Sequence, residues 1–211
     1  MFNTLRNAWK IPDLRKKMLF TLSMLMIFRL GSFIPVPGMD TKALSKLIQS
    51  GGLLGFFNTI SGGAFDNFAI FAMSISPYIN STIIMQLLTI AIPSLEALAK
   101  EGEEGRRKIA QYTRYGTVVL ALIQAVALSY GLKGYLLRTD AASITLVALS
   151  LTAGTAFLMW LGEQINEKGI GNGISLLIFA GIISRVPGGV LQIIELYKVK
   201  STNLIEMSFF L

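Results

Sequence analysis

The sequence predicts an all-α fold, a polytopic bundle of membrane-spanning helices. The chain of 211 residues is 53% hydrophobic and only 15% charged, whereas soluble domains average about 25% charged residues. Five apolar stretches approach the roughly 20 residues that a helix needs to cross a bilayer. The basic residues collect between these stretches, as is typical of the loops of a membrane protein.

The five expected spans follow a tail at residues 1–17, and they lie within residues 18–198. They are expected at residues 18–36, 68–92, 116–132, 143–161 and 174–190. The first is not interpreted as a cleavable signal peptide, because Pro35, Pro37 and Gly38 follow it without a small-x-small site. A sixth apolar run opens at Leu204 and stops at the last residue, so we expect the sequence to be a piece of a longer protein.

The positions of the basic residues predict the orientation in the membrane. If every run spans, the tail and the loops at residues 93–115 and 162–173 lie on one side, and they carry more lysine and arginine than the other side. The positive-inside rule then places the N-terminus in the cytoplasm. The formal charge of +7 is therefore attributed to topology and not to nucleic-acid binding.

A short apolar segment at residues 53–60 breaks the pattern of spans. It is far too short to cross a membrane, and Gly51, Gly52, Gly62 and Gly63 flank it. A short helix of this kind is tolerated at membrane depth only where protein or a wet cavity surrounds it. It could equally lie on the outer surface as an interfacial helix, and the residues alone leave both alternatives open.

The composition excludes several kinds of chemistry. The chain has no cysteine and no histidine, which excludes a disulfide framework, a thiolate nucleophile, a Cys/His zinc site and an imidazole base. All twelve acidic residues fall in or near expected loops, whereas ion-coupled carriers keep such groups near the midplane. The glycine-rich run at residues 169–173 is not a nucleotide loop, since no strand precedes it and no Gly-Lys-Ser/Thr follows.

Polar groups inside the expected spans have two possible roles each. Arg29 is the one charge within the first four expected spans, and it either snorkels to the interface or has a functional or structural hydrogen-bonding partner. The second and third spans also contain uncharged polar side chains, which hold helices together or face a wet interior. These side chains are Asn80, Ser81, Thr82, Gln86, Thr117 and Gln124.

Long motifs then resemble the SecY family of protein-translocation channels. In chain order they are FRLGSFIPVPG at 28–38, ISGGA at 60–64, ISPYI at 75–79, EGEEGRRK at 101–108, QYTRYG at 111–116, MWLGEQI at 159–165 and GIGNGIS at 169–175. They are correctly ordered over nearly the whole chain. The resemblance implies the amino-terminal half of a ten-span channel built from inverted repeats, with residues 199–211 forming the hinge between halves and the truncated start of span six.

The resemblance also implies roles for individual residues. The pore ring would include Ile75, Ile79, Ile174 and Ile178. The plug would be Leu53, Leu54, Gly55, Phe56, Phe57, Asn58, Thr59, Ile60, Ser61, Gly62, Gly63 and Ala64. The lateral gate that receives a signal sequence would be lined by Asn80, Ser81, Thr82, Gln86, Thr117 and Gln124. The loop that contacts cytoplasmic partners would present Arg106, Arg107, Lys108 and Arg114.

The function implied is a protein-conducting channel without enzymatic activity or cofactor. It would pass unfolded preproteins across the bacterial cytoplasmic membrane, and membrane proteins into it, driven by a motor ATPase or a ribosome. Its partners would be the carboxy-terminal half of the channel, SecE, SecG, SecA, the ribosome, signal peptides, preproteins and membrane lipid, with no nucleic acid bound directly. The alternative is a secondary transporter or small-solute channel. A membrane-embedded enzyme is a third possibility, but the sequence contains no catalytic motif that supports it.

Overall fold

The computed structural model describes residues 11–41, 43–44, 58 and 61–198. This part of the chain is helical, and its elements follow one another as α2 (Pro12–Gly31), α5 (Ser76–Ala91), α6 (Pro93–Lys100), α7 (Glu103–Gly131), the 3₁₀ turn η1 (Lys133–Tyr135), α8 (Ala141–Lys168), α9 (Gly173–Ile183) and α10 (Val186–Lys198). Extended pairing within it is limited to two isolated bridges, Pro35 with Ala69 and Met39 with Leu136. The predicted all-α fold is confirmed.

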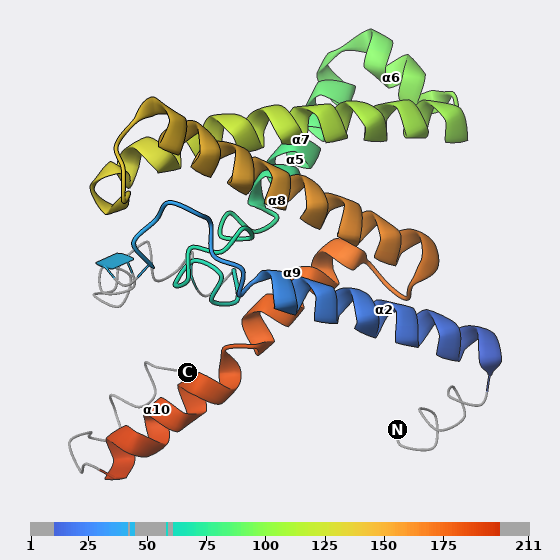
Figure 1. Cartoon of the computed structure of the whole chain (residues 1–211). Coiled ribbons are helices and arrows are strands. Elements are labelled where there is room, and N and C mark those ends of the chain that lie inside the picture. Colours follow the sequence, from blue (N-terminus) through green and yellow to red (C-terminus); the bar gives the residue numbers. More distant parts are fainter. Residues whose placement is uncertain (1–10, 42, 45–57, 59–60, 199–211) are drawn as a thin grey trace.

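The two long helices α7 and α8 form the centre of the bundle and run antiparallel (Figure 1). α5 packs on α7, while α2 and α9 both pack on α8 and on each other. Small residues make these close contacts possible, because they let helix backbones approach. The buried face of α7 repeats such residues every fourth position, at Thr113, Thr117, Ala121, Ala125 and Ser129.

Two apolar clusters form the core. One lies where residues 36–44 and 65–72 meet α7 and α8, around Phe68 and Leu151. The other lies where α2, α8 and α9 converge on residues 64–75, around Phe28, Phe71 and Leu161. The first residues of α9 and the irregular segment before α5 are therefore held against the same core.

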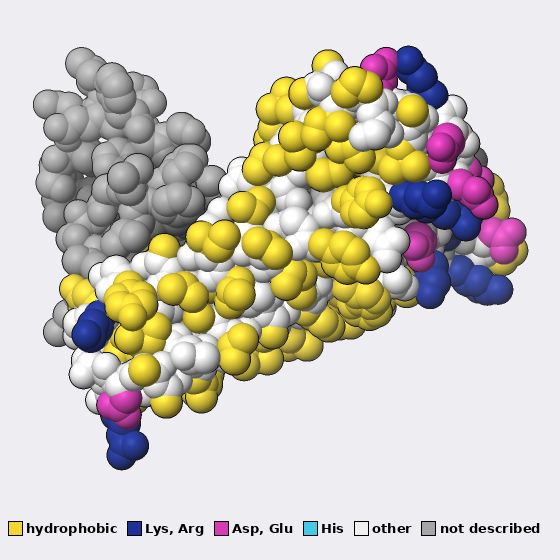
Figure 2. All heavy atoms as spheres, turned by 90° about the horizontal axis from the view of Figure 1, so that it is seen from above, with side chains coloured by type: hydrophobic (Ala, Val, Ile, Leu, Met, Phe, Trp, Pro, Cys, Tyr) yellow, Lys and Arg dark blue, Asp and Glu magenta, His cyan; other side chains and the backbone are white. Residues whose placement is uncertain are grey.

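Large apolar side chains also cover the outside of the bundle. Leu122 and Ile123 on α7, Trp160 on α8 and Phe179 on α9 are between 41% and 60% exposed. In Figure 2 the charged side chains gather toward the ends of the molecule, and much of the surface between them is hydrophobic. An apolar surface of this extent is expected to face lipid or another protein.

Two helices of the described residues are long and apolar enough to cross a membrane. They are α8 and the run Gly173–Leu191, and α5 with α6 would make a third if this pair, bent by 101°, is one broken span. The sequence predicted five spans. For α2 and α7, which include more charged and polar residues, spanning stays a prediction.

The boundaries of the first two expected spans were wrong. α2 begins at Pro12, inside the expected tail, and ends at Gly31. The chain then leaves the helix, because residues 34–36 pair with residues 68–70: Val36 N donates to Phe68 O at 2.9 Å, and Ile70 N donates to Ile34 O at 3.0 Å. Residues 61–75 form turns and not the start of a span, and burial in protein makes such a backbone tolerable at membrane depth.

Helices also replace most of the expected loops. Residues 93–115 consist of α6 and the start of α7, with a break at Glu101 and Gly102, where Gly102 has φ of 82°. Within residues 162–173, α8 continues to Lys168. The fifth span is interrupted at Ser184 and Arg185, between α9 and α10. Hydropathy marks where a span ends, but a helix can continue into the aqueous phase. The expected hinge and sixth span, residues 199–211, lie outside the described residues.

Candidate functional site

The four isoleucines of the expected pore ring gather at one apolar cluster. Ile75, the residue before α5, is only 2% exposed within this cluster, and Ile79, Ile174 and Ile178 are partly buried and pack against it. Ile79 follows Ile75 by one helical turn, as Ile178 follows Ile174, so each pair projects from one side of its helix. The structure thus brings together residues that are about a hundred positions apart.

Glycine makes this approach of α8 and α9 possible. A Cβ atom at Gly162 would lie 2.6 Å from Ile174 Cδ1, and one at Gly173 would lie 2.1 Å from the Gly162 carbonyl oxygen. Gly169 approaches Thr21, whose hydroxyl oxygen accepts a 3.0 Å hydrogen bond from Ile170 N. The glycine-rich run therefore serves helix packing, and Asn172 caps α9 by accepting from Ser175 N at 3.1 Å.

The expected plug is described at its C-terminal end. Residues 53–57 and 59–60 lie outside the described residues, whereas Asn58, Ser61, Gly62 and Ala64 are buried and Gly63 is half-buried. The Asn58 carbonyl oxygen accepts from Gly63 N at 3.0 Å and from Ser61 Oγ at 3.2 Å. Asn58 and residues 61–66, named here the plug root, therefore form a compact turn enclosed by protein. Enclosure is the setting that a re-entrant segment needs.

Arg29 binds this plug root. Its Nη1 donates to the Gly62 carbonyl oxygen at 2.7 Å and to Ser184 Oγ at 3.1 Å. Its guanidinium carbon also lies 4.7 Å from the centroid of the Phe33 ring, within range of a cation–π interaction. Of the two roles that the sequence left open for this charge, the structure supports hydrogen bonding.

A second arginine contacts the plug root from the turn between α9 and α10. Arg185 Nη2 lies 2.5 Å from Asp66 Oδ2. Both arginines line a cleft with Ser32, Phe33, Gly62, Gly63, Asp66 and Asn67. Sequence reasoning missed this ion pair, because it counted Asp66 only as a charge in or near a loop and Arg185 only toward the orientation in the membrane. The two residues are 119 positions apart, and a single sequence contains no signal that relates them.

The residues expected to line a lateral gate have different environments. Ser81 and Thr117 are buried and both donate to the Thr113 carbonyl oxygen, at 2.8 and 2.7 Å. The Ser81 bond joins α5 to α7, whereas the Thr117 bond lies within α7. Asn80 and Gln86 are exposed. Gln86 and Thr82 line a groove between α5 and α7 that also includes Arg106 and Glu163. Gln124 is half-buried farther along α7.

The expected basic contact residues divide into two kinds. Arg106, Arg107 and Lys108 are exposed on the first turns of α7. Arg107 pairs with Glu103 at 2.8 Å on the helix surface, with both side chains about four-fifths exposed. Arg114 instead joins α7 to α8, because its Nε lies 2.7 Å from Glu163 Oε1. Arg114 therefore has a structural partner already.

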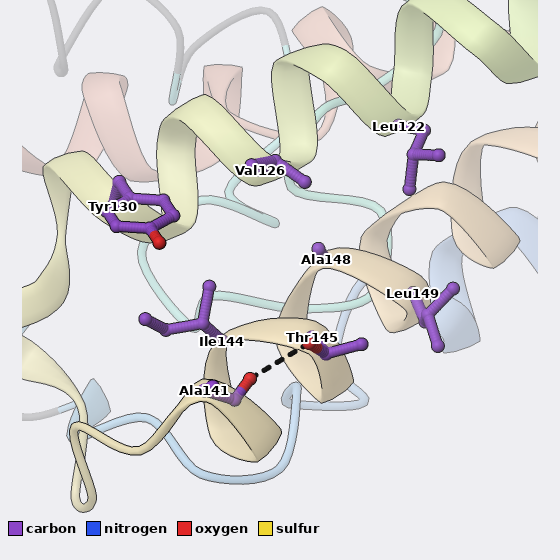
Figure 3. Close-up of a pocket in the computed structure, with 8 residues that line it drawn as sticks. All are labelled: Leu122, Val126, Tyr130, Ala141, Ile144, Thr145, Ala148 and Leu149. Carbon is purple, nitrogen blue, oxygen red and sulfur yellow. Dashed lines mark hydrogen bonds between the residues drawn. The ribbon is translucent and has the colours of Figure 1, made fainter.

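A further groove between α7 and α8 has no chemistry of its own. Figure 3 shows its lining, with Leu122, Val126 and Tyr130 from α7 facing Ile144 and Leu149 from α8. The hydroxyl of Thr145 donates a 2.9 Å hydrogen bond to the Ala141 carbonyl oxygen within α8. With no charged group in its lining, the groove is an apolar surface and not a candidate for catalysis or ion binding.

Comparison with known proteins gives one consistent result. A family model described as SecY matches residues 69–211. The chain is 54% identical over 194 residues to the protein translocase subunit SecY of Halalkalibacterium halodurans, covering 90% of this chain and 45% of that protein. It is 49% identical over 193 residues to the corresponding subunit of Escherichia coli K12, covering 88% and 44%. The chain thus spans about half the length of the curated relatives it matches.

Solved structures share the fold. A protein-conducting channel aligns with a TM-score of 0.64 at 19% identity, covering 90% of this chain and 43% of that one. Sec61 in a canine ribosome–channel complex from the endoplasmic reticulum aligns with the same TM-score, identity and coverage. At this identity the likeness concerns the arrangement of helices.

Proposed function

The chain belongs to the SecY family, and we propose that it forms the amino-terminal half of a protein-conducting channel in the bacterial cytoplasmic membrane. The channel passes unfolded preproteins across this membrane and membrane proteins into it. It has no enzymatic activity, and a motor ATPase or a translating ribosome drives it. One observation carries the proposal: four isoleucines from two distant segments meet at one cluster that also packs against the plug root.

The isoleucines suit a constriction that any sequence can cross. A narrow apolar ring tends to dewet, which blocks ions without a charged filter. Aliphatic side chains form no hydrogen bonds, so they do not hold a passing peptide. Ile79, Ile174 and Ile178 keep part of their surface exposed, and we infer that this surface faces the pore and the other half of the channel. Ile75 is buried in the packed core, and we propose that it supports the constriction without facing the pore.

The carboxy-terminal half is the first partner that we propose, because α9 and α10 carry exposed apolar side chains that another protein surface would bury. Phe179 and Leu191 are 57% and 62% exposed, and α10 extends away from the bundle with few contacts beyond those to α9 (Figure 1). Inverted-repeat channels place their path between the two halves. We propose that SecE and SecG complete the complex and that lipid covers the remaining apolar faces.

Signal sequences and cytoplasmic partners meet different parts of the chain. We propose that Asn80 and Gln86 lie beside the lateral gate, where modest polar contacts allow reversible opening. The exposed charges of Arg106, Arg107 and Lys108 contact the motor ATPase SecA or the ribosome. The N-terminus lies in the cytoplasm, on the same side as these charges.

Deleting residues 53–57 from the full-length channel tests this function. Asn58 and residues 61–66 stay in place, so the plug root keeps its internal hydrogen bonds. Resting ion conductance of the reconstituted channel should rise, while export of a preprotein continues. A secondary transporter, the alternative, would show neither ion leak nor any response to a signal peptide. Unchanged leak together with solute uptake would therefore favour the transporter.

A further inference from the structure

We propose that Asp66 and Arg185, assisted by Arg29, form an ionic latch that holds the plug root against the end of α9. The inference rests on the proposed function, since it assigns to these three charged residues the role of holding the plug in the closed position. The latch joins three separate elements: the end of α2, the plug root and the turn between α9 and α10.

The ion pair is placed where it resists solvent. The contact of 2.5 Å joins side chains that are 37% exposed for Arg185 and 25% exposed for Asp66. Fully exposed pairs contribute little because water and salt screen them, whereas partly buried pairs are screened much less. Asp66 is also bound to the expected plug itself, because its backbone N donates to Asn58 Oδ1 at 3.0 Å. Pulling on Asn58 therefore strains the ion pair.

The second contact point lies at Gly62. Its carbonyl oxygen accepts from Arg29 Nη1 at 2.7 Å, and Ser184 Oγ lies 3.3 Å from the same oxygen. Gly62 has φ of 65°, and a Cβ atom there would lie 2.7 Å from Gly181 Cα. Only glycine permits the plug root to lie this close to the backbone of α9.

The ion pair is weak enough to be broken reversibly. In the part of the chain that the structure describes, Asp66 Oδ1 and Arg185 Nε are both buried without a hydrogen-bond partner. The pair is thus joined through one oxygen and one nitrogen, and not through the two parallel bonds of the strongest arginine–carboxylate pairs. Gly62 and Gly63, both at positive φ, supply backbone freedom for the release.

The test uses a thiol reporter in the full-length channel with its partner subunits. The 211 residues contain no cysteine, and any cysteine of the other half is replaced by serine. Ser61→Cys then reports on the plug root, because Ser61 is only 2% exposed. Labelling by an external thiol reagent is compared in this parent, in Asp66→Ala, in Arg185→Met and in the exchange variant Asp66→Arg/Arg185→Asp. Glu96→Ala and Lys100→Met remove an exposed ion pair as matched controls.

Each single variant should label about fivefold faster than the parent, as expected from losing a partly buried charged pair. The exchange variant should return toward the parental rate, and the controls should equal it. Unchanged rates in the single variants would overturn the latch, as would an exchange variant that labels as fast as they do.

Ion conductance, measured on the same samples, separates the latch from the proposed function. Faster labelling with raised resting leak supports both. Faster labelling without leak supports the latch and overturns the assignment of the plug root to closing a pore.

Discussion

Ser81 of α5 donates a 2.8 Å hydrogen bond to the carbonyl oxygen of Thr113 in α7. Gly116 lies directly against this contact, since a Cβ atom there would be 2.7 Å from Ser81 Oγ. The polar run at residues 80–82, which the sequence associated with a wet interior or with helix association, therefore includes at least one residue that attaches α5 to its neighbour. Movement of α5 at a gate would have to carry α7 with it.

This contact predicts a coupled pair of substitutions. Ser81→Ala should lower the stability of the purified channel by about 0.6–1.7 kcal/mol, the usual range for an interhelical hydrogen bond in a membrane protein. Gly116→Ala should lower it further through the clash with Ser81 Oγ, and less so when Ser81 is also alanine. Thermal unfolding of the four proteins measures the coupling, and additive effects would contradict it. Ser23→Ala, on an exposed serine that bonds within its own helix, should change nothing.

The contacts of Arg29 predict that replacing it with lysine lowers stability although the positive charge is kept. Arg29→Lys keeps the charge, but an ammonium group lacks the planar guanidinium that places Nη1 at Gly62 O and Ser184 Oγ while it lies over the Phe33 ring. We expect a loss of about 1–3 kcal/mol in unfolding free energy, the range for hydrogen bonds to charged groups. Ser184→Ala should cost less, because Arg29 keeps its bond to Gly62. Arg138→Lys, at an exposed position, is the control, and equal melting temperatures for both lysine variants would refute the prediction.

The sequence predicted the fold class because apolar runs of spanning length leave few alternatives to membrane helices. It failed at residues 68–75, where Phe68 and Phe71 suggested the start of a span. These residues are apolar because they are buried in protein, and the segment is irregular because its backbone bonds to residues 34–36. Hydropathy reports burial in an apolar environment and does not distinguish lipid from a protein core.

The site was only partly predictable for a similar reason. The motif resemblance identified the four isoleucines, and the structure brings them to one cluster. It did not identify the Asp66–Arg185 pair, since neither residue lies in a recognisable pattern and their contact depends on the tertiary fold. Ser81 and Gln86 looked alike in the sequence, yet the first is buried and the second exposed. The side of the helix that faces α7 decides this difference.

Arg106 and Arg107 predict a binding effect without a loss of stability. Both are exposed, so Arg106→Glu/Arg107→Glu should leave thermal unfolding nearly unchanged. Affinity for the motor ATPase or the ribosome should fall about tenfold, mainly through slower association, because exposed charges act on encounter. Equilibrium binding at low and high salt measures this. Arg114→Glu should behave oppositely, lowering stability through its lost contact with Glu163. Unchanged affinity would leave Arg106 and Arg107 with topology as their only role.

The isoleucine cluster predicts that neighbouring residues respond differently to the same change. Ile75 is 2% exposed, so Ile75→Asn buries an amide and should mainly destabilise the protein, by about 2 kcal/mol or more. Ile79 and Ile178 are only partly buried. Asparagine at either position should leave unfolding closer to normal while wetting the constriction, which raises resting ion conductance and relaxes the requirement for a signal sequence.

Ile90→Asn is the matched control for these changes. Ile90 lies on the same helix as Ile79 and is 79% exposed, so an asparagine there meets lipid or solvent and not the cluster. Conductance of reconstituted full-length channels and export of a preprotein with a defective signal sequence provide the two measurements. If the isoleucines form a ring, Ile79→Asn and Ile178→Asn should both give higher resting conductance than Ile90→Asn, and both should export more of the preprotein with the defective signal sequence. If all three leak equally, or if neither cluster variant leaks, the isoleucines serve helix packing and the constriction lies elsewhere.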